Sequence, residues 1–436
     1  MLKRLGLAVL ASLLLIGRAY SEDRRVDHSQ LVVMTFNAEF MWDGVEPEEG
    51  SVDFSWKGSQ TEAEEHMQRI AGVIIRSNPD VLNLVEIENL NALNTLNQKF
   101  LSGRGYRPYF VEGKDTQTGQ DVGLLTRIDP ENGQIQRDDR TGKSGNVTKG
   151  VSKNYYARFS VDGRRIAVVG LHFLAQPNSE NRRKPREAQA AVMGRLAKEL
   201  ADGGYAPIVL GDFNDYDADV PDHINSQPIS AVLRIVKQMD PQHGTDDLVN
   251  AASLLPTGSR YTSFYDKNQN DLVDHPEEHT SIDHILISPS LAPMVHSVDI
   301  PHAHNPTEVS DHYPVVLRLK LGDGMGPASK GGRVVISRLL PNPPGDESLN
   351  EEATIKNVGS APVDLTGFTL RDLTKKTWKL DSLGTLNAGE AKTIKRNGQA
   401  MGMNNRGDTT ELVDKDGSVI DSITYGKVDE DEEVLR

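Results

Sequence analysis

Short apolar runs, each bounded by polar and turn-forming residues, recur along the first two thirds of the chain. Runs of this kind that are rich in Val, Ile and Leu predict buried strands. The predicted strands are Leu31 to Phe36, Val81 to Val85, Val122 to Leu125, Tyr155 to Val161, Arg165 to Leu171, Pro207 to Leu210, Ile282 to Ile287 and Val315 to Leu319. Asp162 and Gly163, which separate two of these runs, predict a tight hairpin turn.

Two segments carry apolar residues at helical spacing. The capping-box pair Thr61 and Glu64 predicts the start of the first helix, and Asn78 before Pro79 predicts its end. Pro185 is expected to open the second helix. The apolar positions are Met67, Ile70, Ala71, Ile74 and Ile75 in the first helix, and Ala188, Val192, Leu196 and Leu200 in the second. Because strands and helices interleave without strict alternation, the pattern favours an α/β fold of two packed sheets flanked by helices.

The composition changes at residues 322–332, where Gly, Pro, Ser and Lys replace apolar residues and predict a linker. Beyond it, residues 333–427 predict a small all-β sandwich of the immunoglobulin kind. Its expected strands are Val334 to Leu340, Ala353 to Asn357, Phe368 to Leu370, Thr377 to Leu380, Ala391 to Ile394, Thr410 to Val413 and Val419 to Tyr425. We expect the acidic residues 428–436 to form a frayed tail.

The first residues predict a targeting signal. Lys3 and Arg4 precede an apolar stretch from Leu5 to Ile16, and small residues follow, so cleavage is expected after Ser21. Residues 1–21 would then be a signal peptide and the protein secreted or periplasmic, with no stable membrane insertion. The apolar stretch is shorter than the roughly 20 residues of a membrane helix. An uncleaved anchor is the alternative.

Composition narrows the function classes. The chain of 436 residues is 37% hydrophobic, a composition that indicates neither a disordered nor a coiled-coil protein. It contains no cysteine, so no disulfide framework supports the fold. The net charge of -15 argues against a broad sequence-independent grip on nucleic acid. Local basic patches remain candidates, with solvated loops as the alternative: Arg182, Arg183, Lys184 and Arg186, and the run Arg137, Arg140, Lys143, Lys149 and Lys153.

Polar side chains follow the predicted strands in a set that suits phosphodiester hydrolysis, which needs positive charge, a positioned nucleophile and a proton source. Glu86 and Asp311 are hard-oxygen ligands for Mg²⁺ or Mn²⁺. The remaining residues are Asn37, His172, Asp212, Asn214, Asp283 and His312. Taken singly, each has a structural alternative as a turn former or a solvated side chain. Their joint occurrence at strand ends favours one shared site.

Within this set, the two imidazoles can hydrogen-bond phosphate oxygens or relay a proton near neutral pH. Asp212 is expected to take the proton of the attacking water, while Asn214 fixes its direction. Asp283 is expected to hold one imidazole, that of His312, in the right tautomer. The sequence therefore predicts an enzyme whose chemistry rests on these residues.

The ordered segments that carry these residues resemble the endonuclease/exonuclease/phosphatase superfamily across residues 30–321. They are Thr35-Phe36-Asn37, Val85-Glu86-Ile87-Glu88, Gly170-Leu171-His172-Phe173, Gly211-Asp212-Phe213-Asn214-Asp215, Ser281-Ile282-Asp283-His284 and Ser310-Asp311-His312-Tyr313-Pro314. The resemblance implies a four-layered α/β sandwich and a metal-dependent phosphoesterase. It also implies that Asn37 and Glu86 lie at the Mg²⁺ site with Asp311 nearby, and that His172 and His312 contact the scissile phosphate.

One segment departs from this family. Many members place an Arg-Pro pair before the strand that precedes the His172 strand, whereas this chain has Asn154-Tyr155-Tyr156-Ala157-Arg158. For Arg158, packing or a surface ion pair is the alternative to a phosphate contact.

The C-terminal part resembles a lamin-tail domain through Glu352 to Asn357, Asp364 to Leu370, Leu386 to Gly389 and Asp421 to Tyr425. Such modules imply attachment to a surface or a protein partner, and the alternative is a passive sandwich.

Two further questions stay open at this stage. Asp266, Asn268, Asn270, Asp274 and Glu277 have the spacing of a Ca²⁺-binding loop, although Asp271 stands where Gly is usual, and an Asx-rich turn is the alternative. The leading function is a secreted Mg²⁺-dependent nuclease that acts on DNA or RNA. The alternatives are a sphingomyelinase-type phosphodiesterase, for which no exposed apolar hairpin is evident, and a non-catalytic surface-binding protein.

Overall fold

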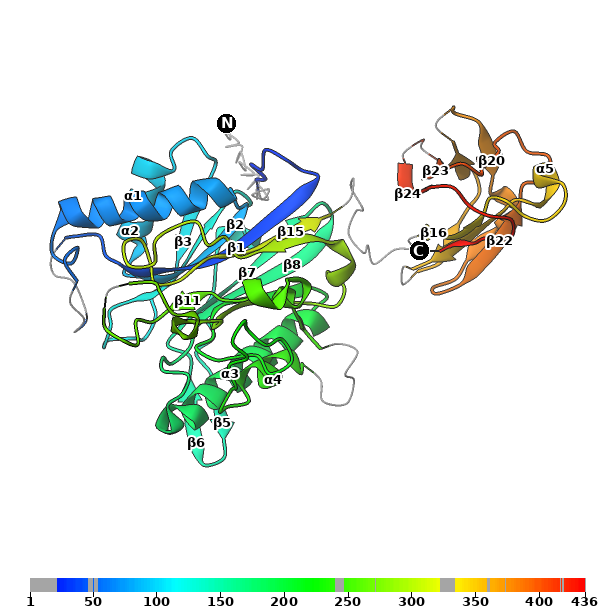
Figure 1. Ribbon diagram of the computed structural model, residues 1–436. Helices are drawn as coiled ribbons and strands as arrows, with labels where there is room; N and C mark the ends of the chain where they lie inside the picture. Colours follow the sequence, from blue (N-terminus) through cyan, green and yellow to red (C-terminus); the bar gives the residue numbers. More distant parts are fainter. Residues whose placement is uncertain are drawn as a thin grey trace, which may run out of the picture.

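The structure is a computed structural model that describes residues 22–45, 50, 54–239, 247–270, 272–321, 334–358, 361–372, 374–415, 417 and 419–435. It shows two folded parts, a larger N-terminal α/β domain and a smaller C-terminal β domain (Figure 1). The expected signal peptide and linker lie outside the described residues. None of the described helices combines the length and the apolar character that crossing a membrane requires.

The first sheet of the N-terminal domain has six strands in the order β14-β15-β1-β2-β4-β3. Their bounds are β1 Gln30–Met41, β2 Val81–Ile87, β3 Arg107–Phe110, β4 Asp121–Thr126, β14 Val295–Asp299 and β15 Val315–Lys320. β1 and β2 are parallel, and β1 is antiparallel to β15. This pairing brings the carboxyl ends of β1 and β2 to the same edge as the start of β15.

The second sheet has five strands in the order β10-β13-β9-β8-β7. Their bounds are β7 Lys153–Val161, β8 Arg164–His172, β9 Ala206–Asp212, β10 Val249–Asn250 and β13 Asp283–Ile287. β8 and β9 run parallel with His172 opposite Asp212, and Asp283 of the antiparallel β13 also faces Asp212. Asp162 and Gly163 both have positive φ, 47° and 73°, which confirms the predicted turn between β7 and β8.

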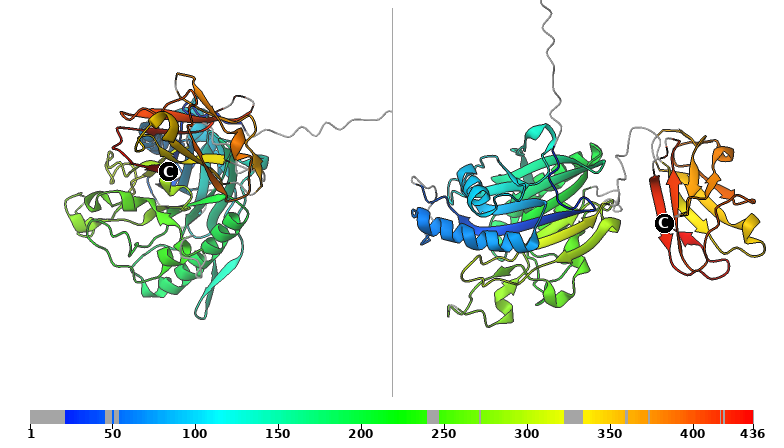
Figure 2. Two further views of the ribbon diagram at one scale, coloured as in Figure 1. Left: turned by 90° about the vertical axis from the view of Figure 1, so that its right-hand side faces the viewer. Right: turned by 90° about the horizontal axis from the view of Figure 1, so that it is seen from above.

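Helices cover both outer faces, so the domain has four layers (Figure 2). Helices α1 (Gln60–Ser77) and α2 (Leu90–Thr95) pack on the six-stranded sheet through one apolar cluster. Helices α3 (Glu180–Asp202) and α4 (Val232–Lys237) pack on the five-stranded sheet through another. A third cluster, which includes Tyr155, lies between the two sheets. The predicted four-layered α/β sandwich is confirmed.

The predicted starts of both long helices are wrong. Ser59 caps α1, because its side chain accepts a hydrogen bond from the Glu62 backbone N–H, so the Thr61 capping box does not form. The end at Asn78, in the left-handed region with φ 49°, is as predicted. Helix α3 begins at Glu180, ahead of Pro185. The sequence did not indicate this start, because the first turns of the helix are polar and carry no apolar periodicity.

The C-terminal domain is a β-sandwich, as predicted, around a core that includes the fully buried Trp378. One sheet has the order β22-β17-β16-β25 and the other β20-β19-β23-β24. Their bounds are β16 Val334–Leu340, β17 Glu352–Asn357, β19 Thr369–Arg371, β20 Thr377–Lys379, β22 Ala391–Lys395, β23 Asp408–Val413, β24 Val419–Tyr425 and β25 Val434–Leu435. A short helix α5 (Glu347–Asn350) and the pair β18 (Val363–Asp364) and β21 (Thr385–Leu386) complete it.

The acidic end of the chain is not the frayed tail that was expected. Strand β25 pairs with β16, and Glu433 forms an ion pair of 2.6 Å with Arg338. Val428 is buried in the same return segment. The acidic composition predicted a solvated tail, whereas in the structure Arg338 on β16 compensates part of the charge.

Short elements connect the layers of the N-terminal domain. The hairpin of β5 and β6 stands beside α3 (Figure 1), and β11 pairs with β12 near the loop that precedes β15. Their bounds are β5 Thr141–Ser144, β6 Val147–Gly150, β11 Ser263–Phe264 and β12 His279–Thr280. An isolated bridge between Ser263 and His312 ties β11 to that loop.

Candidate active site

The polar residues predicted from the sequence converge at one edge of the N-terminal domain, where ends of the two sheets meet. Asn37 and Glu86 come from β1 and β2 of the six-stranded sheet. His172, Asp212 and Asp283 come from β8, β9 and β13 of the five-stranded sheet. Asp311 and His312 lie in the loop that enters β15, and Asn214 follows β9.

Asn37 stands at the centre of the group and is buried. Its Nδ2 atom lies 3.1 Å from Glu86 Oε1, 3.4 Å from Asp212 Oδ2 and 3.4 Å from His312 Nε2. Its Oδ1 atom accepts a hydrogen bond of 3.0 Å from the backbone N–H of Glu39. One amide therefore links residues that are up to 275 positions apart in the sequence.

The two histidines are held differently. His312 Nδ1 lies 2.7 Å from Asp283 Oδ2, the arrangement that fixes the tautomer and orientation of an imidazole, as predicted for this pair. His172 Nε2 lies 3.6 Å from Asp212 Oδ2 and 3.8 Å from Glu86 Oε1, while its Nδ1 atom is buried without a hydrogen-bond partner. His172 therefore faces the carboxylates through one nitrogen only.

Asn214 supports the carboxylate of Asp212 through its backbone. Its N–H donates a hydrogen bond of 2.7 Å to Asp212 Oδ1, and its side chain donates to the backbone carbonyl of Phe173 at 3.3 Å. Asp212 Oδ1 is thus occupied, whereas its Oδ2 atom points toward Asn37 and His172. Asp212 has one oxygen directed at the centre of the group.

Local backbone irregularities aim several of these side chains. Glu86 has φ 62° and sits where the pairing of β2 shifts register with both neighbouring strands. Such a bulge redirects a side chain away from the regular strand alternation. Gly211 precedes Asp212 at φ 142°, and a Cβ atom there would lie 1.9 Å from the carbonyl oxygen of Leu171. Only glycine allows β8 and β9 to approach this closely beside the site.

Burial and crowding of like charges shift the ionisation of the group. Burial, reinforced by the charges of Asp311 and Glu86, raises the pKa of Glu39 to about 9. Loss of solvation raises the pKa of Asp311 to about 6, with His312 opposing and Glu86 adding to the shift. Burial, with the charge of Asp283, raises the pKa of Asp212 well above its ordinary value. Burial is the largest cause of each shift, and neighbouring carboxylates add to it.

The histidines shift in opposite directions. Burial disfavours the charge of His312, but the carboxylates of Asp283 and Asp311 raise its pKa well above the ordinary value. Burial, together with the positive charges of Lys153 and His312, lowers the pKa of His172 well below it. The site therefore combines a charged imidazole with a neutral one.

These residues fit a divalent cation. Among the described residues, no Lys or Arg forms an ion pair with Glu86, Asp311 or Asp212, although all three carboxylates lie within one group of polar side chains. Hard carboxylate and amide oxygens are the ligands that Mg²⁺ and Mn²⁺ prefer. Asp212, Asp283 and His312 also place ligand atoms within 4.8 Å of one another. Which of these atoms bind the ion stays a prediction, with Asn37, Glu86 and Asp311 as the predicted set.

Glu39 is a site residue that the sequence analysis did not identify. It follows Asn37 by two positions, in the irregular end of β1 where the pairing with β2 shifts register. The segment has positive φ at Glu39 and Phe40, and the Phe40 N–H donates to Glu86 Oε2 at 3.0 Å. The signal that could have found Glu39 is a third carboxylate directly beside a predicted ligand.

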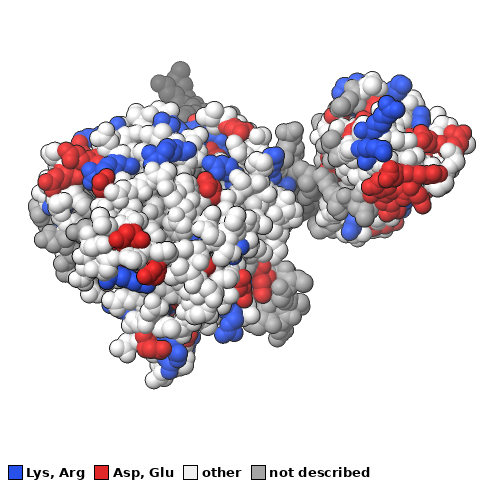
Figure 3. Space-filling view, in the orientation of Figure 1, with Lys and Arg blue, Asp and Glu red and all other residues white. Residues whose placement is uncertain are grey.

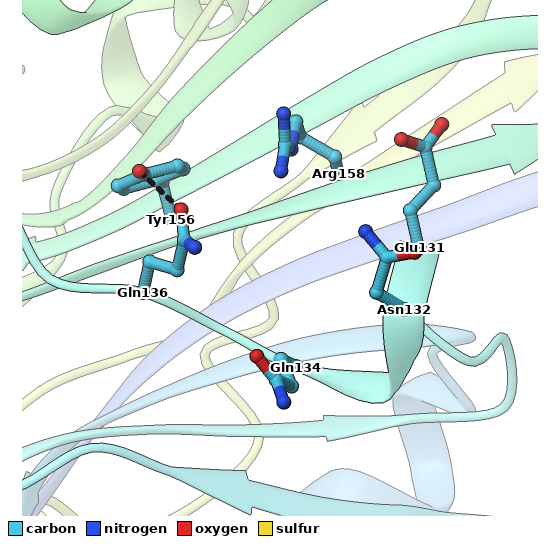
Figure 4. A pocket seen from close by; sticks show the side chains of 6 residues that line it. All are labelled: Glu131, Asn132, Gln134, Gln136, Tyr156 and Arg158. Atoms are coloured by element: carbon cyan, nitrogen blue, oxygen red, sulfur yellow. Dashed lines mark hydrogen bonds between the residues drawn. The ribbon is translucent and has the colours of Figure 1, made fainter.

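Arg158 lies away from the site, as does the pocket that it lines. It pairs in register with Ala167, five positions before His172 along β8. Its guanidinium lies 5.9 Å from the centre of the Tyr205 ring and borders a small polar hollow (Figure 4). Packing rather than phosphate contact is therefore the role of Arg158.

Strand β7 instead places Lys153 near the site. This residue is mostly buried and pairs in register with His172.

The Ca²⁺-loop prediction concerns a surface loop. Asn270 Nδ2 donates to Asp274 at 2.9 Å, Asn268 Nδ2 lies 3.4 Å from Asp274, and Asp266 accepts the backbone N–H of Gln269. Asp271 lies outside the described residues. The side chains of Asp266, Asn268 and Asn270 thus face one turn, but these bonds are equally those of an Asx-rich turn. Calcium binding here stays a prediction.

A four-layered α/β domain with carboxylates, amides and imidazoles at one sheet edge defines a phosphoesterase type of site. The sequence profile of the Endonuclease/Exonuclease/phosphatase family matches residues 34–312, and that of the Lamin Tail Domain matches residues 327–427. The chain therefore belongs to the endonuclease/exonuclease/phosphatase family, whose members are typically metal-dependent hydrolases of phosphoester bonds, and carries a lamin-tail domain.

Solved structures similar to this chain include three from different organisms. The endonuclease/exonuclease/phosphatase from Beutenbergia cavernae is 18% identical, with a TM-score of 0.43, over 91% of this chain and 100% of that chain. Truncated Caenorhabditis elegans TDP2 is 16% identical, with a TM-score of 0.42, over 67% and 98%. The 3' phosphatase NExo from Neisseria, bound to product DNA hairpin, is 17% identical, with a TM-score of 0.44, over 66% and 99%. No curated protein matches the chain.

Proposed function

We propose that the protein is a Mg²⁺- or Mn²⁺-dependent nuclease that hydrolyses the backbone diesters of DNA or RNA by attack of water. The observation that carries this proposal is the convergence of polar groups on Asn37, whose Nδ2 atom lies 3.1 to 3.4 Å from Glu86, Asp212 and His312. It joins a ligand for a hard cation, a base and a charged imidazole in one group. All three are required when water attacks a negatively charged phosphate.

Each residue of the site has a distinct role in this reaction. Asp212 takes the proton of the attacking water through its Oδ2 atom, which points toward Asn37 and His172, while Asn214 keeps the other oxygen occupied. His312, held by Asp283, donates a hydrogen bond to a phosphate oxygen, and His172 contacts the same phosphate. Asn37, Glu86 and Asp311 would hold the divalent cation, which would supply positive charge beside the phosphate oxygens. The bond from phosphorus to the leaving oxygen breaks as the new bond to water forms, and the leaving oxygen takes up a proton from solvent water.

Plasmid nicking with Mg²⁺ and with EDTA tests this proposal, together with sphingomyelin release by the same protein. We expect nicking that EDTA abolishes and no release of phosphocholine. His312→Ala should lower the nicking rate by roughly a hundred- to ten-thousand-fold, because it removes a hydrogen-bond donor to the phosphate. The control is His296→Ala, since His296 is exposed on β14. Turnover by His312→Ala close to that of the control would remove His312 from the mechanism.

The alternatives predict other outcomes of the same assay. Release of phosphocholine without nicking would identify a sphingomyelinase-type phosphodiesterase. Cleavage of neither substrate would favour a surface-binding protein whose larger domain has no catalytic activity.

The proposal includes export of the protein to the periplasm or medium after cleavage near Ser21. It also includes a surface or protein partner for the C-terminal β-sandwich. N-terminal sequencing of protein recovered from the medium tests the export.

A further inference from the structure

The two basic segments of the sequence lie side by side in the fold. The hairpin of β5 and β6 packs against the N-terminal half of α3, although some 40 residues separate them (Figures 1 and 2). The Ser144 hydroxyl donates a hydrogen bond of 2.6 Å to Glu187 Oε2. A Cβ atom on Gly142 would lie 2.0 Å from the carbonyl oxygen of Ala188, so only glycine allows this contact. The hairpin is therefore fixed on the helix.

The fold uses some of the basic residues internally and leaves others free. Four of them form internal ion pairs that hold loops and strands together: Arg137 with Asp139, Arg140 with Asp138, Lys153 with Asp115 and Arg186 with Asp215. Lys143, Lys149 and Lys184 are exposed and form no ion pair among the described residues. Their charges are available to a partner.

These three lysines lie along the hairpin and at the adjoining start of α3. Lys143 pairs with Thr148 and Lys149 with Gly142, so the two lysines project from opposite sides of the ribbon. Lys184 Nζ lies 3.5 Å from the position a Cβ atom would take on Gly145, at the hairpin turn. Arg182, half-buried in the first turn of α3, adds a fourth cation. We name the hairpin and the first turn of α3 the basic arm.

The basic arm is anchored to the candidate active site by its covalent connections and by Arg186. Strand β6 leads through two residues into Lys153, which pairs in register with His172. The buried Arg186 donates to the backbone carbonyls of Leu174, Gln176 and Pro177, in the loop between His172 and α3. The arm therefore keeps a fixed position relative to the residues that surround the phosphate.

The composition of the arm indicates what it binds. Exposed lysines without carboxylate partners attract the phosphate backbone of nucleic acid. Segments 141–150 and 180–187 contain no aromatic residue, whereas binding of single strands relies on aromatic side chains that stack on bases. Val147 is the single large apolar residue of the hairpin, so insertion into a lipid surface is disfavoured. A duplex, whose bases are stacked internally, offers phosphates alone.

We propose that the basic arm binds the phosphate backbone of duplex nucleic acid beside the scissile bond and so makes the enzyme prefer duplex to single-stranded substrate. This inference rests on the proposed nuclease function. Strands of four residues span roughly 13 Å, which corresponds to about four base pairs of duplex. The arm thus extends the contact from the scissile phosphate along the neighbouring helical segment.

Binding of a fluorescent duplex of about 30 base pairs, roughly three helical turns, measured by anisotropy in EDTA, tests this proposal in the full-length chain. We expect Lys143→Gln/Lys149→Gln/Lys184→Gln to weaken duplex binding by about tenfold or more and to lower the slope of log K against log salt by about two to three. The matched control is Arg69→Gln/Arg76→Gln/Lys320→Gln, which removes three exposed charges on α1 and at the far end of β15. This control should stay within about twofold of the unmodified chain.

Three results would each overturn the proposal. The first is duplex binding by the triple variant equal to that of the control. The second is an equal loss of affinity for a single strand of the same length, and the third is a loss of affinity only for vesicles of anionic phospholipid. Hydrolysis of thymidine 5'-p-nitrophenyl phosphate with Mg²⁺ separates this outcome from the nuclease proposal. That small diester cannot reach the arm, so the triple variant should hydrolyse it at the rate of the unmodified chain. Failure of the unmodified chain to hydrolyse any diester would instead contradict the nuclease function.

Discussion

Glu86 shows how a single side chain is committed to the site at a cost in backbone energy. Its φ of 62° lies in the left-handed region, which costs a non-glycine residue about 1 to 3 kcal/mol. The surrounding structure holds it there, because Asn37 donates to one carboxylate oxygen and the Phe40 N–H donates to the other. Strain of this kind at a polar residue in a converged group supports a functional rather than a stabilising role.

Glu39 gives the first prediction. Glu39→Gln removes one of the carboxylates that crowd the site, and we expect it to raise the Mg²⁺ concentration for half-maximal activity by roughly 10- to 100-fold. The metal-free protein should become no less stable, since burial and the charges of Asp311 and Glu86 already disfavour the ionised form of Glu39. Titration of nicking activity with Mg²⁺ measures the first effect and thermal unfolding in EDTA the second.

The control for this prediction is Glu65→Gln. Glu65 is exposed on α1, outside the polar group of the site, and its loss should change neither the Mg²⁺ requirement nor the melting temperature. An unchanged Mg²⁺ requirement in Glu39→Gln would show that Glu39 takes no part in metal binding. Its proximity to the predicted ligands would then be a packing consequence of the irregular end of β1.

Helix α3 and the loops at its start depend on one buried ion pair. Arg186 and Asp215 have fully buried side chains, 3.2 Å apart, and Arg186 also satisfies three backbone carbonyls. Removal of one partner leaves a buried charge uncompensated, so Arg186→Met should destabilise the protein by about 3 to 5 kcal/mol. The double change Arg186→Met/Asp215→Leu should recover a large part of this loss. Urea unfolding of the single and double variants measures both effects.

A matched surface pair calibrates this experiment. Arg183 and Glu180 lie 3.6 Å apart at the exposed start of the same helix. Because exposed pairs contribute about 0 to 1 kcal/mol, Arg183→Met should have little effect. Equal losses in Arg183→Met and Arg186→Met would mean that the buried pair does not anchor the loops beside His172.

The loop from Asp266 to Glu277 gives a prediction about a second cation. If Asp266, Asn268 and Asn270 bind Ca²⁺, then millimolar Ca²⁺ should raise the melting temperature of the chain, since a ligand that binds only the folded state stabilises it. Asp266→Ala should abolish this rise and leave nicking with Mg²⁺ unchanged. Identical melting temperatures with and without Ca²⁺ would assign the segment to an Asx-rich turn.

Periodic apolar patterns predicted the central strands and the packed faces of the helices, because these elements are specified by burial. Elements specified by pairing alone escaped prediction. Strands β5 and β6 contain Gly, Ser, Lys and Thr, and β25 lies in an acidic segment, so none has an apolar run to mark it. The start of α3 was misplaced for the same reason: its first turns face solvent and the site loops rather than the sheet.

The structure brings the predicted site residues together, because each follows a strand whose end reaches one sheet edge. Details that arise from long-range contacts were not predictable. The amide of Asn37 contacts residues from both sheets, and nothing near it in the sequence indicates these partners. Arg186 appears in a basic run and was a candidate for nucleic-acid contact, yet its side chain is buried against Asp215. Charge in the sequence does not distinguish an internal anchor from a surface cation.

Across the whole chain, the charge is distributed unevenly. The net charge is -15, and Figure 3 shows a dense group of acidic side chains on the C-terminal domain, whereas acidic and basic residues are interspersed on the visible face of the N-terminal domain. A strongly acidic protein repels nucleic acid at long range. Binding of a phosphate backbone therefore has to rely on a local surface such as the basic arm, and added salt should weaken that binding.

The C-terminal domain carries a pH-sensitive carboxyl group in its core. Glu351 is 1% exposed; its carboxylate accepts the Met403 backbone N–H at 3.1 Å and lies 3.4 Å from Arg396. Burial raises the pKa of Glu351 to about 7, although Met403 and Arg396 oppose the shift. The group is thus protonated in the folded domain at pH values where it is ionised in the unfolded chain.

This shift sets the direction of the pH dependence. A carboxyl pKa raised from 4.5 to about 7 contributes stability that is complete below pH 4.5 and is lost as the pH rises through 7. In calorimetry of the full chain, the transition of the lamin-tail domain should therefore lie several degrees lower at pH 8 than at pH 5. Glu351→Gln cannot ionise and should flatten that dependence, which also assigns the transition to the lamin-tail domain. Glu430→Gln, which alters an exposed carboxylate of the return segment, should keep it, and a slope that persists in Glu351→Gln would place its origin in another group.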